Sequence, residues 1–409
     1  MLKIIQKKLF KASILFFTFL ISSLLQFPIF ANVSGEIIAS PKEVFTAACK
    51  ALSEKYYFNS KFDFKPYITK YEKNIENIND AYFYIEKVIS KLNDPYTRFL
   101  TKDEFKDEQD IMNSRFVGIG VKLAFQKPLV LDILPKSPAD ISGIKENDYI
   151  LAINNKSTCG LNSNGVANYL KGPRGTILKI TLKRGTEILS KTVKRDEINF
   201  KSVTSETPEN GIAVIKISSF IPFDTSELFK KELENVMSAN ALVLDLRNNS
   251  GGLLKNAVEI ADMFLTEGKI VTSVQNNGNI NELANSNLLF NGDVVVLVNE
   301  HTASASEILA AALKDNNRAL IIGRRTFGKG LVQQIIALPD ESGMHITTAT
   351  YLTPNGKNIN KIGIVPDKIV KDNNEQLRMA KELLSTQIAN KLMKEDARKG
   401  NSLLKISLR

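Results

Sequence analysis

Three short, almost wholly apolar runs in the second half of the chain constrain its fold most. They span residues 212–217, 241–246 and 294–298, a length typical of buried strands. Stretches with helical spacing follow at 253–264 and 304–313. Apolar strands that alternate with helices are typical of a largely parallel sheet that is covered on both faces. We therefore predict a layered α/β core that begins near Gly211.

Other segments have a helical pattern. Apolar residues recur at helical spacing in two early segments and one late segment, at 42–57, 79–92 and 375–395. Asn79 is a candidate N-cap, and Asp94-Pro95 ends the second helix, because the residue before proline avoids the helical region. The last helix either packs on the core or joins two subunits of a homo-oligomer.

Between the early helices and the core lies a β-rich stretch. Short alternating runs separated by turn residues occur at 120–123, 129–133, 149–153 and 177–182, with one short helix at 163–170. The predicted fold class is a multidomain α/β protein. Its expected parts are a targeting segment (1–31), a helical region (32–103), a β-rich domain (104–196), an α/β core (197–370) and a helical tail (371–409).

Residues 1–31 have the features of a signal peptide. Four lysines and no acidic residue occupy the first eleven positions, an apolar run spans 12–25, and Ala31 offers a small residue at the cut. The run is short for a membrane span of about 20 residues. Ile29 is imperfect at the third position before the cut, so an uncleaved membrane anchor is the alternative. Both alternatives predict export across the inner membrane, to the periplasm or cell envelope.

Charge and cysteine content are weak guides. The formal charge is +10, and without the four N-terminal lysines it falls to +6, spread along the chain. Because there is no zinc-finger spacing and no basic-aromatic cluster, a solvated surface is favoured over nucleic-acid binding. Cys49 and Cys159 are far apart in sequence. One disulfide in an oxidising compartment and two unpaired thiols are equally consistent with them.

The histidine content restricts the hydrolytic mechanisms. Only His301 and His345 are present, and there is no Gly-x-Ser-x-Gly or His-Glu-x-x-His motif. A Ser-His-Asp hydrolase and a metal hydrolase are both unsupported, so we expect neither a metal nor another cofactor. If the chain is a hydrolase, its base is another kind of residue.

Three segments suit a serine hydrolase that lacks a histidine base. Ser304 follows a strand and begins a helix, where backbone N–H groups and the helix dipole stabilise an oxyanion. A capping box with Glu307 is its structural alternative. Lys329 lies between two glycines in a strand-like region, and a surface lysine in a turn is its alternative. The segment 245–253 ends in paired glycines with N–H groups for an oxyanion hole, or is a plain strand-to-helix turn.

Together these segments resemble the C-terminal processing (tail-specific) serine proteases, a family with a PDZ domain and a crotonase-related catalytic core. The resemblance covers nearly the whole chain after the signal, and the order and spacing of its motifs are specific. The motifs lie at 92–97, 116–120, 246–252, 304–307, 327–330, 351–354 and 363–367. The resemblance implies that 104–196 is the PDZ domain and 197–370 the catalytic core.

The resemblance also implies roles for single residues of the catalytic site. Ser304 is the expected nucleophile, Lys329 its general base and Gln333 the residue that orients the lysine. Asp315 is expected to support the site. The remaining expected groups are the oxyanion-hole N–H groups, which belong to Ala305 and to Gly251 or Gly252.

The proposed base must be uncharged to accept a proton. A free lysine has a pKa of about 10.4 and is charged at neutral pH, whereas burial lowers this value. We therefore expect Phe327, Leu331 and core residues to enclose Lys329.

In the PDZ domain, the resemblance implies that Gly118, Ile119 and Gly120 form the loop that holds a peptide's terminal carboxylate. A β domain that only spaces the other parts is the alternative. Two residues depart from the family. Lys171 is the candidate PDZ sensor, but the family often has arginine there, with a forked geometry that lysine lacks. Ser250 replaces the usual proline and is expected to loosen the oxyanion turn.

The resulting hypothesis is an envelope endopeptidase that cleaves proteins with exposed, apolar C-termini. Its expected partners are protein or peptide substrates and an adaptor or activator. A non-catalytic PDZ adaptor and a crotonase-like enzyme that acts on a thioester are the alternatives. Intact Ser304, Lys329 and Gln333 argue against the first, and the signal peptide and PDZ segment argue against the second.

Overall fold

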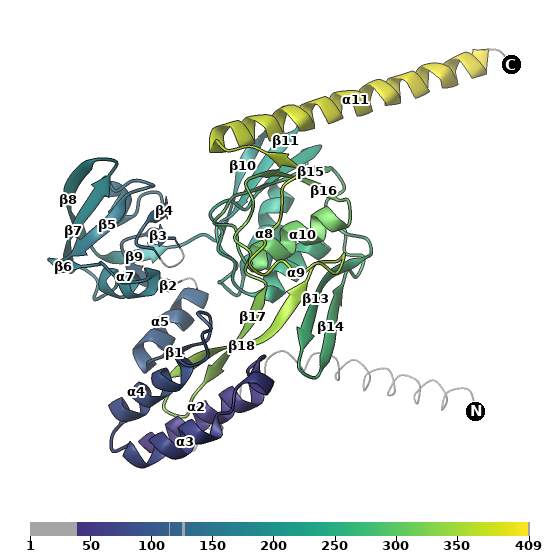
Figure 1. Ribbon diagram of the computed structural model, residues 1–409. Coiled ribbons are helices and arrows are strands. Elements are labelled where there is room, and N and C mark those ends of the chain that lie inside the picture. The colour runs from purple at the N-terminus through teal and green to yellow at the C-terminus, as the bar shows by residue number, and fades with distance from the viewer. Residues whose placement is uncertain (1–38, 114, 125–126, 408–409) are drawn as a thin grey trace, which may run out of the picture. The chain divides into compact units, whose positions relative to one another are not determined.

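The computed structural model describes residues 39–407 except residues 114 and 125–126. The predicted signal peptide lies outside the described residues. The described chain contains an N-terminal group of helices, a β-rich domain and an α/β core, which confirms the predicted fold class (Figure 1). No helix in this part of the chain has both the length and the apolar character that crossing a membrane requires.

The helices and strands have the following bounds. The helices are α2 (Pro41–Lys55), α3 (Lys65–Tyr71), α4 (Ile78–Ile89), α5 (Lys102–Met112), α6 (Pro138–Ile141), α7 (Ser163–Leu170), α8 (Thr225–Asn235), α9 (Leu254–Asp262), α10 (Ala305–Asp315) and α11 (Asn373–Ser407). The strands outside the core are β1 (Arg98–Leu100), β2 (Arg115–Gly118), β3 (Val121–Leu123), β4 (Val130–Ile133), β5 (Tyr149–Ile153), β6 (Lys156–Ser157), β7 (Ile177–Arg184), β8 (Glu187–Lys194) and β9 (Asp196–Asn199). Those of the core are β10 (Val203–Glu209), β11 (Ile212–Ile217), β12 (Ala241–Asp245), β13 (Lys269–Gln275), β14 (Gly278–Leu283), β15 (Asp293–Val298), β16 (Ala319–Gly323), β17 (Leu331–Ala337), β18 (Gly343–Leu352) and β19 (Lys368–Ile369).

A six-stranded sheet is the centre of the α/β core. Its order is β10-β11-β12-β15-β16-β19, and every neighbouring pair except β10 and β11 is parallel. The three apolar runs of the sequence form β11, β12 and β15. Helices cover both faces, α8, α9 and α10 on one and α11 on the other (Figure 1). This burial explains why the strands are apolar throughout instead of alternating.

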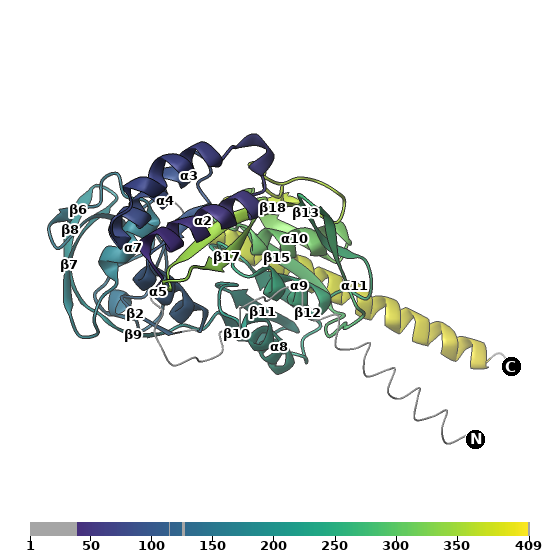
Figure 2. The same ribbon diagram turned by 90° about the horizontal axis from the view of Figure 1, so that it is seen from below.

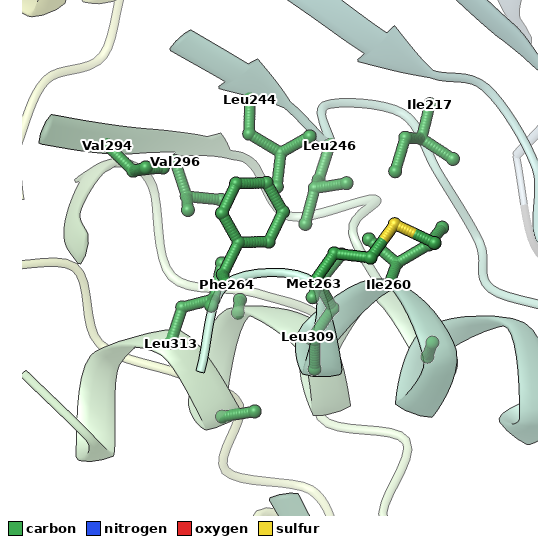
Figure 3. Close-up of a cluster of buried hydrophobic side chains, with 14 of the residues drawn as sticks. Ile217, Leu244, Leu246, Ile260, Met263, Phe264, Val294, Val296, Leu309 and Leu313 are labelled. Carbon is green, nitrogen blue, oxygen red and sulfur yellow. The ribbon is translucent and has the colours of Figure 1, made fainter. Parts of the chain in front are cut away.

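The larger apolar cluster lies between this sheet and the helices α8, α9 and α10. Figure 3 shows Phe264 packed beneath Leu244 and Val296, with Leu309 and Leu313 of α10 on the helix side. All five side chains are almost completely buried. This packing fixes the N-terminal end of α10, and with it Ser304, at the end of β15.

A second sheet joins the early helices to the core. Its order is β1-β18-β13-β14, and β17 also pairs with β18. The pairing of β1 with β18 sets Arg98 opposite His345. Helix α2 packs along β18, as Figure 2 also shows. The segment between α4 and β1 is thereby brought close to the loop that precedes β17.

The β-rich domain has its own apolar core, to which β3, β4, β5, β7, β8, α6 and α7 contribute. Strand β3 pairs with β4 and, among the described residues, with no other strand. Val121 and Leu123 of β3 pack toward this core, as do Val166 and Leu170 of α7. An edge strand beside a helix is the geometry that accepts an added peptide strand.

Some local expectations need correction. Asn77, and not Asn79, caps α4, because its side-chain oxygen accepts the N–H groups of Asn79 and Asp80 at 2.9 and 3.2 Å. The last helix extends beyond residue 395, to Ser407, and its first half packs on the core sheet. Cys49 is buried, Cys159 is exposed, and neither forms a disulfide.

Candidate active site

Ser304 lies in a strained turn between β15 and α10. Its backbone has φ 56° and ψ −120°, a conformation that costs residues other than glycine about 1–3 kcal/mol. The residue is partly exposed, whereas Ala303 and Ala305 beside it are buried. Ser304 is thus partly exposed at a helix N-terminus, in a strained strand-to-helix turn of the kind found at nucleophile elbows.

The buried carboxylate of Glu307 ties this turn to the loop that carries Lys329. Its Oε2 accepts the backbone N–H groups of Ser304 and Lys329, each at 2.9 Å. Its Oε1 accepts the Gly328 N–H at 2.7 Å and the Thr326 hydroxyl at 2.5 Å. Burial raises the pKa of Glu307, and these four hydrogen bonds act in the opposite direction. Because one oxygen binds both N–H groups, the backbones of Ser304 and Lys329 lie side by side.

Tyr351 of β18 is a second link between the two residues. Its ring is buried, and its hydroxyl donates to the backbone carbonyl of Lys329. Burial raises the pKa of Tyr351 well above its usual value, while a hydrogen bond with the Ser304 side chain lowers it. The phenol therefore lies between the serine hydroxyl and the lysine backbone.

The amine of Lys329 lies in an environment that disfavours its charge. Burial lowers its pKa to about 8, and the positive charge of Arg98 acts in the same direction. The carboxylates of Asp94, Glu307 and Glu108 oppose the shift. A substantial fraction of the amines is neutral slightly above neutral pH, as a general base requires.

The side chains around Lys329 differ in part from the expectation. Leu331 is buried, but the exposed fraction of Phe327 is 38%. The aromatic ring beside the amine belongs to Tyr96, whose centroid lies 4.8 Å from Nζ. In the sequence, Tyr96 belongs to one of the family motifs, at 92–97, but no role was assigned to it. It lies 233 positions from Lys329, so no local pattern connects the two residues.

The turn at residues 248–252 packs directly against Ser304. A Cβ atom on Gly251 would lie 2.8 Å from Cβ of Ser304 and 3.0 Å from the Ala305 nitrogen. Buried Asn249 fixes this contact, since its carbonyl accepts the Ala303 N–H at 2.9 Å and the Ser306 hydroxyl at 3.0 Å. The two predicted oxyanion segments therefore meet at the nucleophile candidate.

Hydrogen bonding distinguishes Gly251 from Gly252 as the candidate donor of the oxyanion hole. The Gly251 N–H donates to Oδ1 of Asn249 at 2.9 Å. Within the described residues, no acceptor binds the N–H of Gly252 or Ala305. Gly252 has a φ of 147°, and Phe220 pairs with it, which holds its backbone in place. Gly252 and Ala305 are thus the pair whose N–H groups remain open to a ligand.

The two remaining predicted residues make contacts with other parts of the core. The Gln333 amide donates to the Thr347 hydroxyl at 3.3 Å, across the β17–β18 pair. Asp315 ends α10, about 16 Å from Ser304 at 1.5 Å per residue, and its carboxylate accepts the Asn355 N–H at 3.1 Å. The structure does not bring Asp315 to the serine.

The predicted carboxylate loop lies between β2 and β3. Ile119 is buried, and its carbonyl accepts the Ala139 N–H at 2.8 Å. Gly120 has a φ of 81°, and a Cβ there would lie 2.3 Å from Cβ of Ser137. Among the described residues, the N–H groups of Ile119 and Gly120 have no acceptor, while Gly118 pairs with Asp196. The loop presents donors at the end of edge strand β3.

Lys171, the candidate sensor, follows α7 and forms an ion pair of 3.0 Å with Asp107 of α5. Glu108, which follows Asp107 in α5, forms an ion pair of 3.1 Å with Arg98, and its carboxylate lies 2.8 Å from Nε2 of His345. A series of charged contacts therefore extends from the β-rich domain toward Lys329.

Comparison with known proteins finds two family matches along the chain. Residues 211–370 match the model of peptidase family S41, and residues 129–184 match that of the PDZ domain. A carboxyl-terminal-processing protease of Picosynechococcus sp. is 37% identical over 311 residues, which cover 73% of this chain and 75% of that protein. The carboxy-terminal processing protease CtpA of Bacillus subtilis is 34% identical over 330 residues, 75% of this chain and 68% of that protein.

A solved structure of a C-terminal processing protease has a similar fold. The photosystem II D1 C-terminal processing protease superposes with a TM-score of 0.69 at 29% identity, covering 82% of this chain and 94% of that one. The fold and these matches define a serine-type peptidase with a PDZ domain. The chain belongs to peptidase family S41, among the carboxyl-terminal-processing proteases, which confirms the family that the motifs indicated.

Proposed function

We propose that this protein is an endopeptidase that uses a Ser304–Lys329 pair and selects substrates by their C-termini. One observation carries the catalytic part of the proposal. A single oxygen of Glu307 binds the backbone N–H groups of both residues, next to an amine whose pKa burial lowers to about 8. The resemblance of the motifs around Ser304 and Lys329 to the family that the chain belongs to supports the same assignment.

The proposed reaction is an acyl transfer. Neutral Lys329 takes the hydroxyl proton of Ser304, and the serine oxygen forms a bond to the scissile carbonyl carbon. The carbonyl electrons move onto oxygen, where the N–H groups of Ala305 and Gly252 stabilise the negative charge. The lysine ammonium then gives its proton to the leaving amine, and water later hydrolyses the acyl-enzyme.

Two further residues support this site in the proposal. Gln333 orients the lysine by fixing β17 against β18 through Thr347, since Lys329 lies two residues before that strand. Asp315 acts at a distance, by holding the Asn355 turn at the far end of α10. Neither residue transfers a proton.

The proposed substrates are proteins with an exposed, apolar C-terminus. A peptide strand added to β3 would set its terminal carboxylate against the open N–H groups of the 118–120 loop. Its apolar side chains would contact the surface between β3 and α7. Lys171 would report occupancy through its pair with Asp107. The basic, apolar N-terminal segment supports a site of action in the cell envelope.

Cleavage of a synthetic peptide tests both parts of the proposal. The peptide ends in several apolar residues and is made as a free acid and as a C-terminal amide, and mass spectrometry detects the fragments. We expect cleavage of the acid, slower cleavage of the amide, and losses above about a thousandfold in Ser304→Ala and Lys329→Ala. Lys357→Ala, at an exposed position, controls for loss of a lysine.

Each outcome addresses one claim. Wild-type rates in Lys329→Ala, with a folded protein by circular dichroism, would remove the lysine from the mechanism. Equal cleavage of acid and amide would exclude carboxylate recognition. A protein that binds the peptide but releases no fragment would be an adaptor instead of a peptidase.

A further inference from the structure

The segment between α4 and β1 contributes to the surroundings of Lys329, although it lies outside both family matches at 129–184 and 211–370. The carboxylate of Asp94 accepts the Tyr96 N–H at 3.0 Å and the Thr97 hydroxyl at 2.7 Å. The Thr97 hydroxyl in turn accepts the Thr347 N–H of β18 at 3.1 Å. These bonds fix the segment on the strand that also carries Tyr351.

The fixed segment holds an aromatic face against the amine. Nζ of Lys329 lies 4.8 Å from the centroid of the Tyr96 ring, within the range of a cation–π contact. An aromatic face attracts an ammonium ion far more than a neutral amine, because the attraction is electrostatic. The contact therefore favours the protonated lysine.

The other groups that face this amine come from several elements. Arg98 of β1 repels the ammonium, and Asp94, Glu108 of α5 and Glu307 of α10 attract it. The buried hydroxyl of Tyr351 binds the backbone carbonyl of Lys329. Tyr96 is the aromatic ring recorded over Nζ in the described chain. The Tyr96 ring differs from the three carboxylates, because its attraction for the ammonium is directional and requires the amine to lie over the ring face.

We propose that Tyr96 is a positioning residue for the proton transfer, whose ring stabilises the ammonium that forms when Lys329 takes the proton of Ser304. This inference rests on the proposed function. In the transfer, the O–H bond of Ser304 breaks, an N–H bond forms on Lys329, and the freed electron pair attacks the substrate carbonyl. The ring then stabilises the charge that develops in the transition state more than it stabilises the neutral ground state.

Kinetics of Tyr96→Leu and Tyr96→Phe in the mature protein, from pH 6 to 10, test this role. In Tyr96→Leu we expect the acid-limb pKa of kcat/KM to fall by about 0.4–1.5 pH units. At high pH, kcat should fall about two- to thirtyfold with little change in KM. Tyr96→Phe should keep the wild-type profile. Phe83→Leu removes a ring 5.1 Å from the ammonium of Lys87 on α4 and controls for ring loss elsewhere.

Aromatic substitutions of nearly the same shape at position 96 keep the test usable if the Tyr96→Leu variant does not fold. With phenylalanine and then increasingly fluorinated phenylalanines at position 96, the acid-limb pKa should fall stepwise as the ring face loses electron density. An unchanged pKa across this series, or an equal loss of activity in Tyr96→Phe and Tyr96→Leu, would overturn the proposal. Failure of the Ser304–Lys329 mechanism is recognised separately, by wild-type cleavage in Lys329→Ala.

Discussion

At the scale of single residues, the proposed catalytic role of Lys329 has a cost in stability. Burial lowers its pKa to about 8 in the folded protein, from 10.5. Between these two values the unfolded chain binds more protons, so the free energy of unfolding rises with pH across this window. Below pH 8 the folded state bears the full penalty, about 3 kcal/mol for a shift of this size. In the proposed mechanism, the same shift places the acid limb of activity near pH 8.

Replacing the lysine with an apolar side chain of similar length should remove this penalty. We expect Lys329→Met to raise the free energy of unfolding at pH 7 by up to about 3 kcal/mol, with a gain that shrinks from pH 8 to pH 10.5. Urea titrations at pH 7 and at pH 10.5 measure the change, with exposed Lys357→Met as the control. A destabilised Lys329→Met protein at pH 7 would contradict the assigned cause of the pKa shift.

The residue types at the site were predictable, and their partners were not. Ser304 and Lys329 stood out because a strand-to-helix junction and paired glycines are local features of the sequence. From the sequence, Glu307 was recognised only as the capping-box partner of Ser304, three residues before it. In the structure its side chain also binds Thr326 and Gly328. Such contacts depend on how β15, α10 and β17 pack, which no local pattern encodes.

At the scale of elements, the 248–252 turn and the N-terminus of α10 act as one unit. Gly251→Ala adds a Cβ atom 2.8 Å from that of Ser304, at a φ of 95°. We expect cleavage to fall by more than about a hundredfold, since one displaced oxyanion donor has an effect of this size. Peptide cleavage assays measure the loss. Gly356→Ala has a similar positive φ of 75° with no atom within 4 Å, and should remain active.

Elements that bury one continuous apolar run were predicted almost to the residue, and others were not. The expected strands at 212–217 and 241–246 are β11 and β12. Strand β18 and its partner β1 escaped notice, because their residues mix polar and apolar types and owe their conformation to pairing. This pairing is what brings Tyr96 to the site, so the missed strands and the missed residue have one cause.

At the scale of the whole molecule, the core sheet is covered by helices on both faces, and the helix on the second face is the C-terminal helix α11. Helix α11 packs on β11, β12, β15 and β16, where Ala380 and Leu384 are completely buried. An uncovered face of a parallel sheet would expose the apolar row that includes Val243 and Leu297. The sequence left open whether this helix serves the core or a second subunit, and its first half serves the core.

Two leucines on α11 separate these roles. Leu384→Ala should lower the free energy of unfolding by about 2–5 kcal/mol, because it leaves a cavity against the sheet. Leu392→Ala is the matched control, since 57% of Leu392 is exposed and its loss should change stability by less than about 0.5 kcal/mol. Urea titration of both variants gives the comparison. Equal stability of Leu384→Ala and wild type would mean that the sheet face is closed without α11. A loss of stability in Leu392→Ala that depends on protein concentration would instead assign the outer half of the helix to contacts between subunits.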